Sequence, residues 1–464
     1  MSNESVNGGK PEGMTAENFG YKQELKRVLK TPDLIVYGLL FIIVTAPMGV
    51  FGEVHVLSHG MTPMVYVVGA VAMIFTALSY QQMSNRFPIA GSVYSYVQRG
   101  INPHVGFFVG WLIMIDYFLI PALNYGFVGA WCHDLLPAIP IWVFIIILLA
   151  INTFINYRGI TLMQIVNWVV FIIQAAIVVV FVVVGINFIM NGGGYGGFTI
   201  KPIYNAEYFN IGFIATAATV ACLSFLGFDA ISTLSEETIR PERSIGRATV
   251  LTLILVGIIF FVITYVAASV WGNKSLDELD PVTGTFQVAL LMGGQALRVT
   301  LTVVMLIGGA VGSLAAQAAI TRILFSMSRD NMMPKFMGKV HEKFQTPYIT
   351  VLLVAVIIFI CSFVPPMNLV RFVNFGGLSS FIVLNFAVFW FFFVREGRRH
   401  SVGDIVKFLI CPAIGMFILG FVWSGFDWPT LILGFSWLAA GIIFGAVKTH
   451  GFKEVPDVFK NAQL

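Results

Sequence analysis

Three acidic residues lie within long apolar stretches of the sequence: Glu53, Asp116 and Asp229. A carboxylate inside a membrane-spanning helix is costly to bury, so such a residue is a candidate functional site by default. Asp229 can pair with an ammonium group or carry a proton, or it can simply cap backbone N–H groups. Asp116 precedes Tyr117 and either meets a ligand or forms an interhelical hydrogen bond. Glu53, close to His55, belongs either to an outer mouth or to a plain surface.

Helix-breaking residues interrupt two of these apolar stretches. Pro47 and Gly49 lie shortly before Glu53, and Gly227 lies two residues before Asp229. Proline removes an N–H donor and clashes with the preceding turn, and glycine lowers the cost of unwinding. Broken backbone at membrane depth is tolerated only where it lines protein or water. We therefore expect unwound backbone at both places, with free carbonyls near Ala46 and Gly49, although a packing kink is the alternative at each.

Aromatic residues flank the second break. Phe225 and Phe228 are three residues apart beside Asp229. One of them is expected to gate a site or to face an ammonium group through its ring. The alternative is that both belong to the core or face lipid, since the chain has 43 phenylalanines.

The end of the same apolar stretch carries two adjacent glutamates. Glu236 and Glu237 are followed by Arg240 and Arg243. The pair is expected to form an inner gate by salt bridges to basic loops, or else to lie on a solvated helix end. Either glutamate, like Asp229, is also a candidate to carry a coupling proton.

The elements that must position these residues are membrane-spanning helices. The chain has 464 residues, of which 58% are apolar and 11% charged, and its mean hydropathy is +0.86. This composition excludes an ordinary soluble enzyme, a disordered protein and a nucleic-acid-binding protein. About 20 apolar residues cross a bilayer as a helix, and twelve such segments are predicted. They centre on residues 34–57, 62–85, 104–131, 141–157, 163–190, 209–235, 247–271, 296–325, 348–364, 368–394, 405–425 and 428–447.

The positive charges give the orientation of these spans. With the N-terminus on the cytoplasmic side, all but four of the 27 lysines and arginines fall on that side. The four exceptions are Lys201, Lys274, Arg298 and Arg371. Such a bias is typical of cytoplasmic loops, so both termini are predicted to be cytoplasmic.

Enzymatic and metal chemistry are not expected. The predicted spans contain no zinc-type cluster of His and Glu and no Ser–His pairing. His55 and His59 are four residues apart but lack a third ligand. We therefore expect neither a metal nor a cofactor, and no nucleic-acid partner. The expected partners are a small molecule and the lipid bilayer, with the oligomeric state left open.

Several segments resemble the amino acid–polyamine–organocation (APC) superfamily of transporters, and within it the putrescine importers. The resemblance covers about residues 20–450. The segments that carry it are Phe87–Tyr96 (FPIAGSVYSY), Ile101–Phe107 (INPHVGF), Ser224–Thr238 (SFLGFDAISTLSEET), Arg329–Asn331 (RDN) and Asn374–Leu378 (NFGGL).

The resemblance implies an all-α fold like that of the leucine transporter. Spans 1–10 would form a five-plus-five inverted repeat over residues 31–400, with spans 11 and 12 appended over 401–447. Cytoplasmic tails would cover 1–30 and 448–464. The resemblance further implies that substrate lies between the breaks of spans 1 and 6, near spans 3, 8 and 10. It also implies alternating access powered by an ion gradient, usually of protons.

One departure from the family pattern bears on the substrate. Amino-acid carriers of the superfamily usually have Gly-x-Gly at the first break, whose N–H groups hold the substrate carboxylate. Here the matching stretch is Pro47-Met48-Gly49, and Pro47 offers no N–H. With Asp116, Tyr117 and Asp229 nearby, this favours a polyamine such as putrescine, imported across a bacterial inner membrane. An amino-acid importer or exchanger is the alternative, because the remaining donors still suit a carboxylate.

The coupling ion is left open by a second departure. Some members carry a lysine in span 5 that stands in for a sodium ion. Residues 163–190 contain no lysine, and their only glutamines are Gln164 and Gln174. We expect proton coupling. A membrane sensor that binds ligand without transport is a further alternative, which the short loops disfavour.

Overall fold

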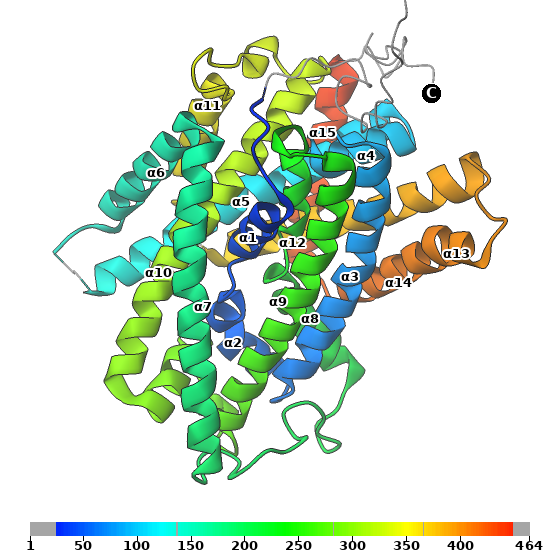
Figure 1. Ribbon diagram of the computed structural model, residues 1–464. Coiled ribbons are helices and arrows are strands. Elements are labelled where there is room, and N and C mark those ends of the chain that lie inside the picture. The colour runs from blue at the N-terminus through cyan, green and yellow to red at the C-terminus, as the bar shows by residue number, and fades with distance from the viewer. Residues whose placement is uncertain (1–24, 136–137, 282, 365, 449–464) are drawn as a thin grey trace, which may run out of the picture.

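The computed structural model describes residues 25–135, 138–281, 283–364 and 366–448 (Figure 1). These residues form helices joined by turns and loops, and the extended pairing among them is one isolated bridge between Leu29 and Thr238. The α-helices are α1 Thr31–Ile42, α2 Ala46–Leu57, α3 Thr62–Arg86, α4 Ser92–Gly100, α5 Pro103–Leu135, α6 Ile141–Arg158, α7 Ile160–Met190, α8 Ile211–Leu223, α9 Pro241–Trp271, α10 Gly284–Arg329, α11 Tyr348–Cys361, α12 Pro366–Val388, α13 Val402–Ile405, α14 Cys411–Trp423 and α15 Trp428–Lys448. Shorter 3-10 segments are η2 Phe228–Glu237, η3 Leu276–Glu278 and η4 Lys335–Gly338, and π-helical turns are η5 Phe389–Arg395 and η6 Val406–Ile410.

The expected all-helical membrane protein is confirmed, but the number of spans is not. In the described part of the chain, ten helical segments are long and apolar enough to cross a membrane, and α1 with α2 adds an eleventh if the bent pair is one span. The segment expected over 348–364 is α11, a shorter apolar helix. Twelve spans and the inverted repeat therefore stay predictions. The predicted side of the two termini falls on residues 1–24 and 449–464, outside the described residues.

Both apolar stretches are broken, but the first break precedes the residues that predicted it, because Pro47 and Gly49 lie inside α2 and not in unwound backbone. Helices α1 and α2 are bent by 42° across Ile43–Thr45, where Ile43 has a φ of 63°. The helix that begins at α8 ends at Leu223 and resumes as η2 after a turn. Gly227 ends that turn with a φ of 112°, a conformation that side-chain-bearing residues avoid. The two breaks meet because α2 packs against α8, and α1 against η2.

Two segments expected to be loops are helical instead. Residues between spans 2 and 3 contain α4, whose residues are all buried. Helix α10 starts at Gly284, within the segment expected to lie outside the membrane, and bends at Gly294, where φ is 65°. A glycine with positive φ lets two helices join in sequence at a sharp angle. The span expected from residue 296 therefore begins just after this kink, and the part of α10 before Gly294 is a preceding helix that was not expected.

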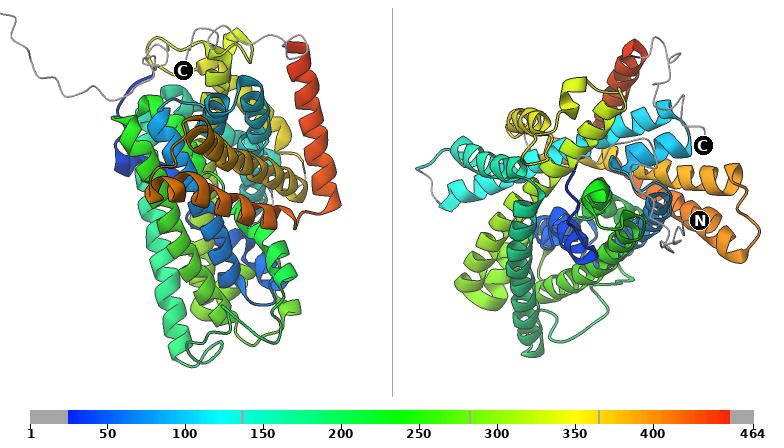
Figure 2. Two further views of the ribbon diagram at one scale, coloured as in Figure 1. Left: turned by 90° about the vertical axis from the view of Figure 1, so that its right-hand side faces the viewer. Right: turned by 45° about the horizontal axis from the view of Figure 1, so that its top comes forward.

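The helices form one bundle in which the broken pairs occupy the middle (Figures 1 and 2). Helix α3 packs along α9, and α5 contacts both α10 and α12. Helix α4 and the segment 330–347 lie at one end of the bundle, and the segment 191–210 lies at the other (Figure 1). We call the end that holds 330–347 the basic end, because Lys335, Lys339 and Lys343 lie there.

Candidate functional site

Asp229 is fully buried in η2, two residues beyond the turn at Gly227. Its Oδ2 accepts hydrogen bonds from the hydroxyls of Tyr117, of Ser92 at 3.2 Å and of Tyr80 at 3.4 Å. Its Oδ1 has no hydrogen-bond partner within the described residues. These three partners are side-chain hydroxyls from three other helices.

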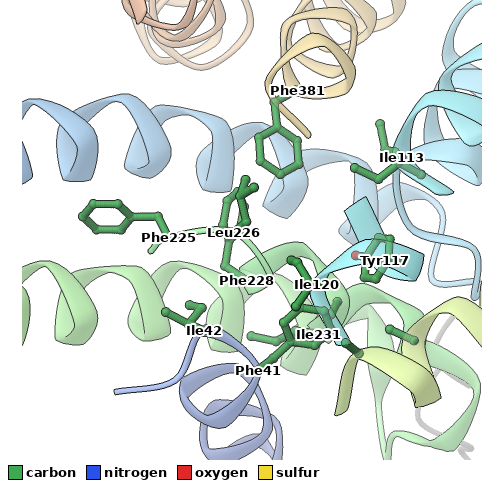
Figure 3. Close-up of a cluster of buried hydrophobic side chains, with 14 of the residues drawn as sticks. Phe41, Ile42, Ile113, Tyr117, Ile120, Phe225, Leu226, Phe228, Ile231 and Phe381 are labelled. Atoms are coloured by element: carbon green, nitrogen blue, oxygen red, sulfur yellow. The ribbon is translucent and has the colours of Figure 1, made fainter. Parts of the chain in front are cut away.

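Aromatic rings pack on the tyrosines that hold this carboxylate, and Figure 3 shows Phe41, Phe228 and Phe381 in the same apolar cluster as Tyr117. Phe228 packs on Tyr80 at 5.6 Å and on Phe381 at 5.1 Å between ring centroids. Phe41 packs edge-on against Tyr117 at 5.6 Å. Such rings exclude water and strengthen any charge interaction made at Asp229.

Phe225 does not share this environment. Its ring packs on Tyr66 at 5.9 Å and on Phe260 at 5.1 Å, so it points toward α3 and α9. Figure 3 shows it directed away from Tyr117. Of the two phenylalanines expected beside the site, the structure brings only Phe228 to the carboxylate.

A cavity of about 110 Å³ lies beside the two breaks. This is well above the roughly 10–15 Å³ that one water needs. The predicted residues Ala46 and Gly49 line it, and so do residues of α5 and α10. The cavity is lined by Phe41, Ile42, Ile43, Thr45, Ala46, Gly49, Val50, Ile120, Leu123, Asn124, Phe127, Val128, Leu223, Ser224, Leu226, Met305 and Gly309.

An apolar wall separates this cavity from Asp229. Phe41 lines the cavity and also packs on Tyr117, which holds the carboxylate. Ile120 and Leu226 also line the cavity, and Figure 3 shows Ile120 close to Phe41. The carboxylate is therefore closed off from the cavity in this conformation.

Asp116 is buried next to Tyr117 on α5, with 1% of its surface exposed. Its Oδ1 has no hydrogen-bond partner in the described part of the chain. On α12, a Cβ added to Gly377 would lie 3.3 Å from Asp116 Oδ2, so the backbone of that helix approaches closely. The expected interhelical hydrogen bond is absent among the described residues, and a second buried carboxylate is left without a donor at one oxygen.

Glu236 and Glu237 form two ion pairs at the basic end. Arg329 donates to both carboxylate oxygens of Glu236, at 2.9 and 2.7 Å. Arg322 donates to both oxygens of Glu237, at 2.6 and 3.0 Å. Both glutamates are buried, so the alternative of a solvated helix end is wrong. The partners come from the end of α10, which the charge pattern assigned to a basic loop.

Further contacts close the basic end around these pairs. The backbone N–H groups of Val28 and Leu29 donate to the carbonyl of Glu237, at 2.9 and 3.0 Å. Tyr94 of α4 donates to Asp330 Oδ2 at 2.8 Å. The segment before α1, α4 and the end of α10 are thereby tied to η2, on the side of Asp229 away from the cavity.

Glu53 lies apart from both groups. It is half-buried near the end of α2, and its backbone N–H donates to the carbonyl of Pro281 at 3.1 Å. The structure therefore places it beside the segment that precedes α10, away from Asp229.

Sequence reasoning missed several residues of the site. Tyr80 and Ser92 hold Asp229, and Phe41 packs on Tyr117, but none of the three lies near Asp229 in the chain. Gln174 of α7 accepts the N–H of Val44 at 3.2 Å and so holds the first break open. Gln174 carried a signal, because a buried glutamine in an apolar span needs a hydrogen-bond partner.

Comparisons with known proteins identify the family of this chain. A family model described as amino acid permease matches residues 35–459. The low-affinity putrescine importer PlaP of Escherichia coli (strain K12) is 33% identical over 432 residues, which cover 93% of this chain and 95% of that protein. The branched-chain amino acid permease BcaP of Bacillus subtilis (strain 168) is 26% identical, covering 91% and 93% of the two chains. A methylthioribose transporter of the same organism is also 26% identical, with the same coverage.

The expected resemblance is therefore confirmed over most of the chain. The matched region contains both helix breaks, Asp229 and the two ion pairs. Its relatives are transporters of small molecules rather than enzymes. With its many membrane-capable helices, this chain is a multi-pass membrane protein that belongs to the amino acid permease family.

Proposed function

We propose that this chain imports a small cationic amine, such as putrescine, across the inner membrane of a bacterium. The observation that carries the proposal is the buried carboxylate of Asp229, whose Oδ1 has no partner among the described residues. A buried charge needs an opposite charge or hydrogen bonds to offset its desolvation, and an ammonium group supplies both. The similarity to an importer named for putrescine supports this substrate class.

In this proposal a diamine meets two carboxylates. Asp229 binds one ammonium group, and Asp116, buried with an unpartnered oxygen, binds the other. Tyr117 orients the Asp229 carboxylate, and Phe228 forms a lid over the bound amine. Pro47 removes one N–H from the first break, which weakens that break as a site for a substrate carboxylate.

In this proposal the cavity side and the basic end of the site open in turn, which is alternating access. The amine enters through the cavity lined by Ala46 and Gly49, whose backbone carbonyls accept hydrogen bonds from it. Phe41 must move to admit it to Asp229. Release to the basic end requires the pairs Glu236–Arg329 and Glu237–Arg322 to separate.

Proton coupling is part of the same proposal. Asp229 and the two gate glutamates are the candidate carriers, since each changes its charge partner during such a cycle. Glu53 is assigned to the outer mouth, near Pro281.

Amino-acid import is the second candidate. The cavity beside the breaks is lined mostly by apolar side chains, which suits an apolar side chain such as that of leucine. The similarity to branched-chain amino acid permeases favours the same alternative.

Uptake into proteoliposomes separates these functions. The full chain is reconstituted, and a pH gradient, acidic outside, is the only driving force. We expect labelled putrescine to accumulate and to be displaced by unlabelled putrescine but not by leucine. Accumulation of leucine without putrescine supports the amino-acid alternative, and binding without flux of either contradicts transport.

A further inference from the structure

A long apolar groove runs along the outer side of α6 and α11, far from Asp229. Its volume is about 610 Å³. The walls include Ile146, Ala150 and Phe154 of α6 and Leu352, Ala355 and Val356 of α11. The two helices lie side by side in Figure 1 and pack against each other. Because the groove opens outward from the bundle, its occupant comes from the surrounding bilayer.

The groove has the length of one lipid chain. Its lining on α6 runs from Ile146 to Tyr157. At about 1.5 Å per residue this stretch is roughly 16 Å long, close to half of a hydrocarbon core of about 30 Å. The groove therefore spans one leaflet, and it ends at Tyr157, at the basic end.

Two cations meet at that end of the groove. The guanidinium of Arg158 lies 5.4 Å from the centroid of the Phe344 ring, and the ammonium of Lys343 lies 5.7 Å from the same centroid. Within the described residues neither forms a salt bridge, although the exposed Glu342 is next to Lys343 in the chain. Two positive charges beside one ring, with no salt-bridge partner among the described residues, attract an anion.

The surroundings hold this end in place. Tyr157 packs against the rings of His341, Phe344 and Tyr348, at 5.5, 5.7 and 6.4 Å. The hydroxyl of Thr346 donates to the carbonyl of Tyr157 at 3.1 Å. The segment before α11 is thus fixed to the end of α6, so the cations are presented on a rigid frame.

We propose that this groove binds an anionic phospholipid, with one acyl chain along α6 and α11 and the phosphate between Arg158 and Lys343. The inner leaflet of a membrane is anionic, and basic pockets between helices on that side bind such head groups. A second copy of this chain is disfavoured as the occupant, because the same two cations would then face each other across a symmetric contact.

Native mass spectrometry of the full chain tests this site, with dioleoylphosphatidylglycerol and dioleoylphosphatidylcholine as probes. We expect one phosphatidylglycerol to bind in preference to phosphatidylcholine. The double variant R158Q/K343Q is expected to bind it about tenfold more weakly, from the loss of two charge contacts near the head group. The matched control K274Q/R298Q removes two positive charges from the opposite side and should bind like the wild type.

Two further binding experiments test the contribution of the groove separately from that of the two charges. Ala355→Trp fills the groove without changing charge and should also weaken phosphatidylglycerol binding. Glycerophosphoglycerol, which has the head group without chains, should not compete. Equal retention of both lipids, no effect of R158Q/K343Q, competition by the free head group, or a lipid-free dimer would each overturn the proposal. If R158Q/K343Q does not fold, a salt titration of the wild type replaces it: high salt should release phosphatidylglycerol but not phosphatidylcholine.

Discussion

Tyr117 on α5 donates its hydroxyl to Oδ2 of Asp229 in η2, 112 positions along the chain. This bond ties an unbroken helix to the unwound part of another. A hydrogen bond to a charged group is stronger than one between neutral groups. Any motion that separates η2 from α5 during transport must therefore break this bond or carry Tyr117 along.

Removing that hydroxyl is expected to weaken substrate binding. Tyr117→Phe leaves the ring on Phe41 but removes one of the three donors to Asp229. A hydrogen bond to a charged group contributes about 1.5–3 kcal/mol, so we expect putrescine uptake efficiency (Vmax/KM) to fall about tenfold or more. Initial rates of labelled putrescine uptake over a range of concentrations measure it.

Tyr125→Phe is the matched control for this variant. Tyr125 is also buried on α5, and its hydroxyl accepts from Asn152, which keeps a second bond to the carbonyl of Ala310. We expect Vmax/KM of Tyr125→Phe to stay close to the wild-type value. Equal losses in the two variants would mean that Tyr117 acts through packing alone.

Opening of the basic end is expected to depend on Arg329. Arg329→Gln leaves Glu236 buried without its charge partner, and breaking such a pair is destabilising by about 3–5 kcal/mol. The closed form should lose population to a form open at this end. The reporter is Ser326→Cys, placed behind the pair, in a chain whose four native cysteines have been replaced. This cysteine should react with maleimide about tenfold faster when Arg329→Gln is also present.

A surface pair provides the control for the gate. Arg86 and Glu396 lie 3.5 Å apart but are 38% and 28% exposed, so their pairing contributes little. Arg86→Gln should leave the labelling of Ser326→Cys unchanged. If both arginine variants label at the wild-type rate, the ion pairs do not gate this end.

The turn at the second break is expected to require glycine. At Gly227 an alanine would adopt an unfavourable positive φ, at a cost of about 1–2 kcal/mol, and its Cβ would collide with the Phe41 ring. Overpacking adds about 1–3 kcal/mol. Gly227→Ala should therefore lower the melting temperature and abolish putrescine uptake.

Gly420→Ala on α14, where a Cβ meets nothing within 4 Å, is the control and should be at least as stable as the wild type. Equal melting temperatures for the two variants would show that the turn tolerates a side chain.

The sequence predicted that two apolar stretches are broken and that a carboxylate follows the second break, but it placed the first break a few residues too late. Proline, glycine and a lone aspartate in an apolar span are local signals, and each has a direct physical meaning. The spacing of Phe225 and Phe228 did not show which of the two lies near the carboxylate. Residues three apart share a face only in a continuous helix, whereas Gly227 turns the chain between these two.

The partners of the site depend on distant contacts. Glu236 and Arg329 are 93 positions apart, and Ser92 and Asp229 are 137 apart. The charge pattern predicts that these arginines lie at one end of the bundle but does not pair them with the glutamates. Pairing follows from how α10 packs against η2, which no single segment encodes.

The central claim is that the Asp229 carboxylate binds an ammonium group of the substrate. Asp229→Asn keeps the shape and removes the charge, and Asp277→Asn in the exposed η3 is its control. The direct measurement is the initial rate of labelled putrescine uptake into proteoliposomes that contain equal amounts of folded protein, verified by size-exclusion chromatography. We expect Asp229→Asn to lose about 100-fold or more, as for a buried charge pair broken on one side, while Asp277→Asn transports normally. Uptake by Asp229→Asn near the wild-type rate would contradict the account.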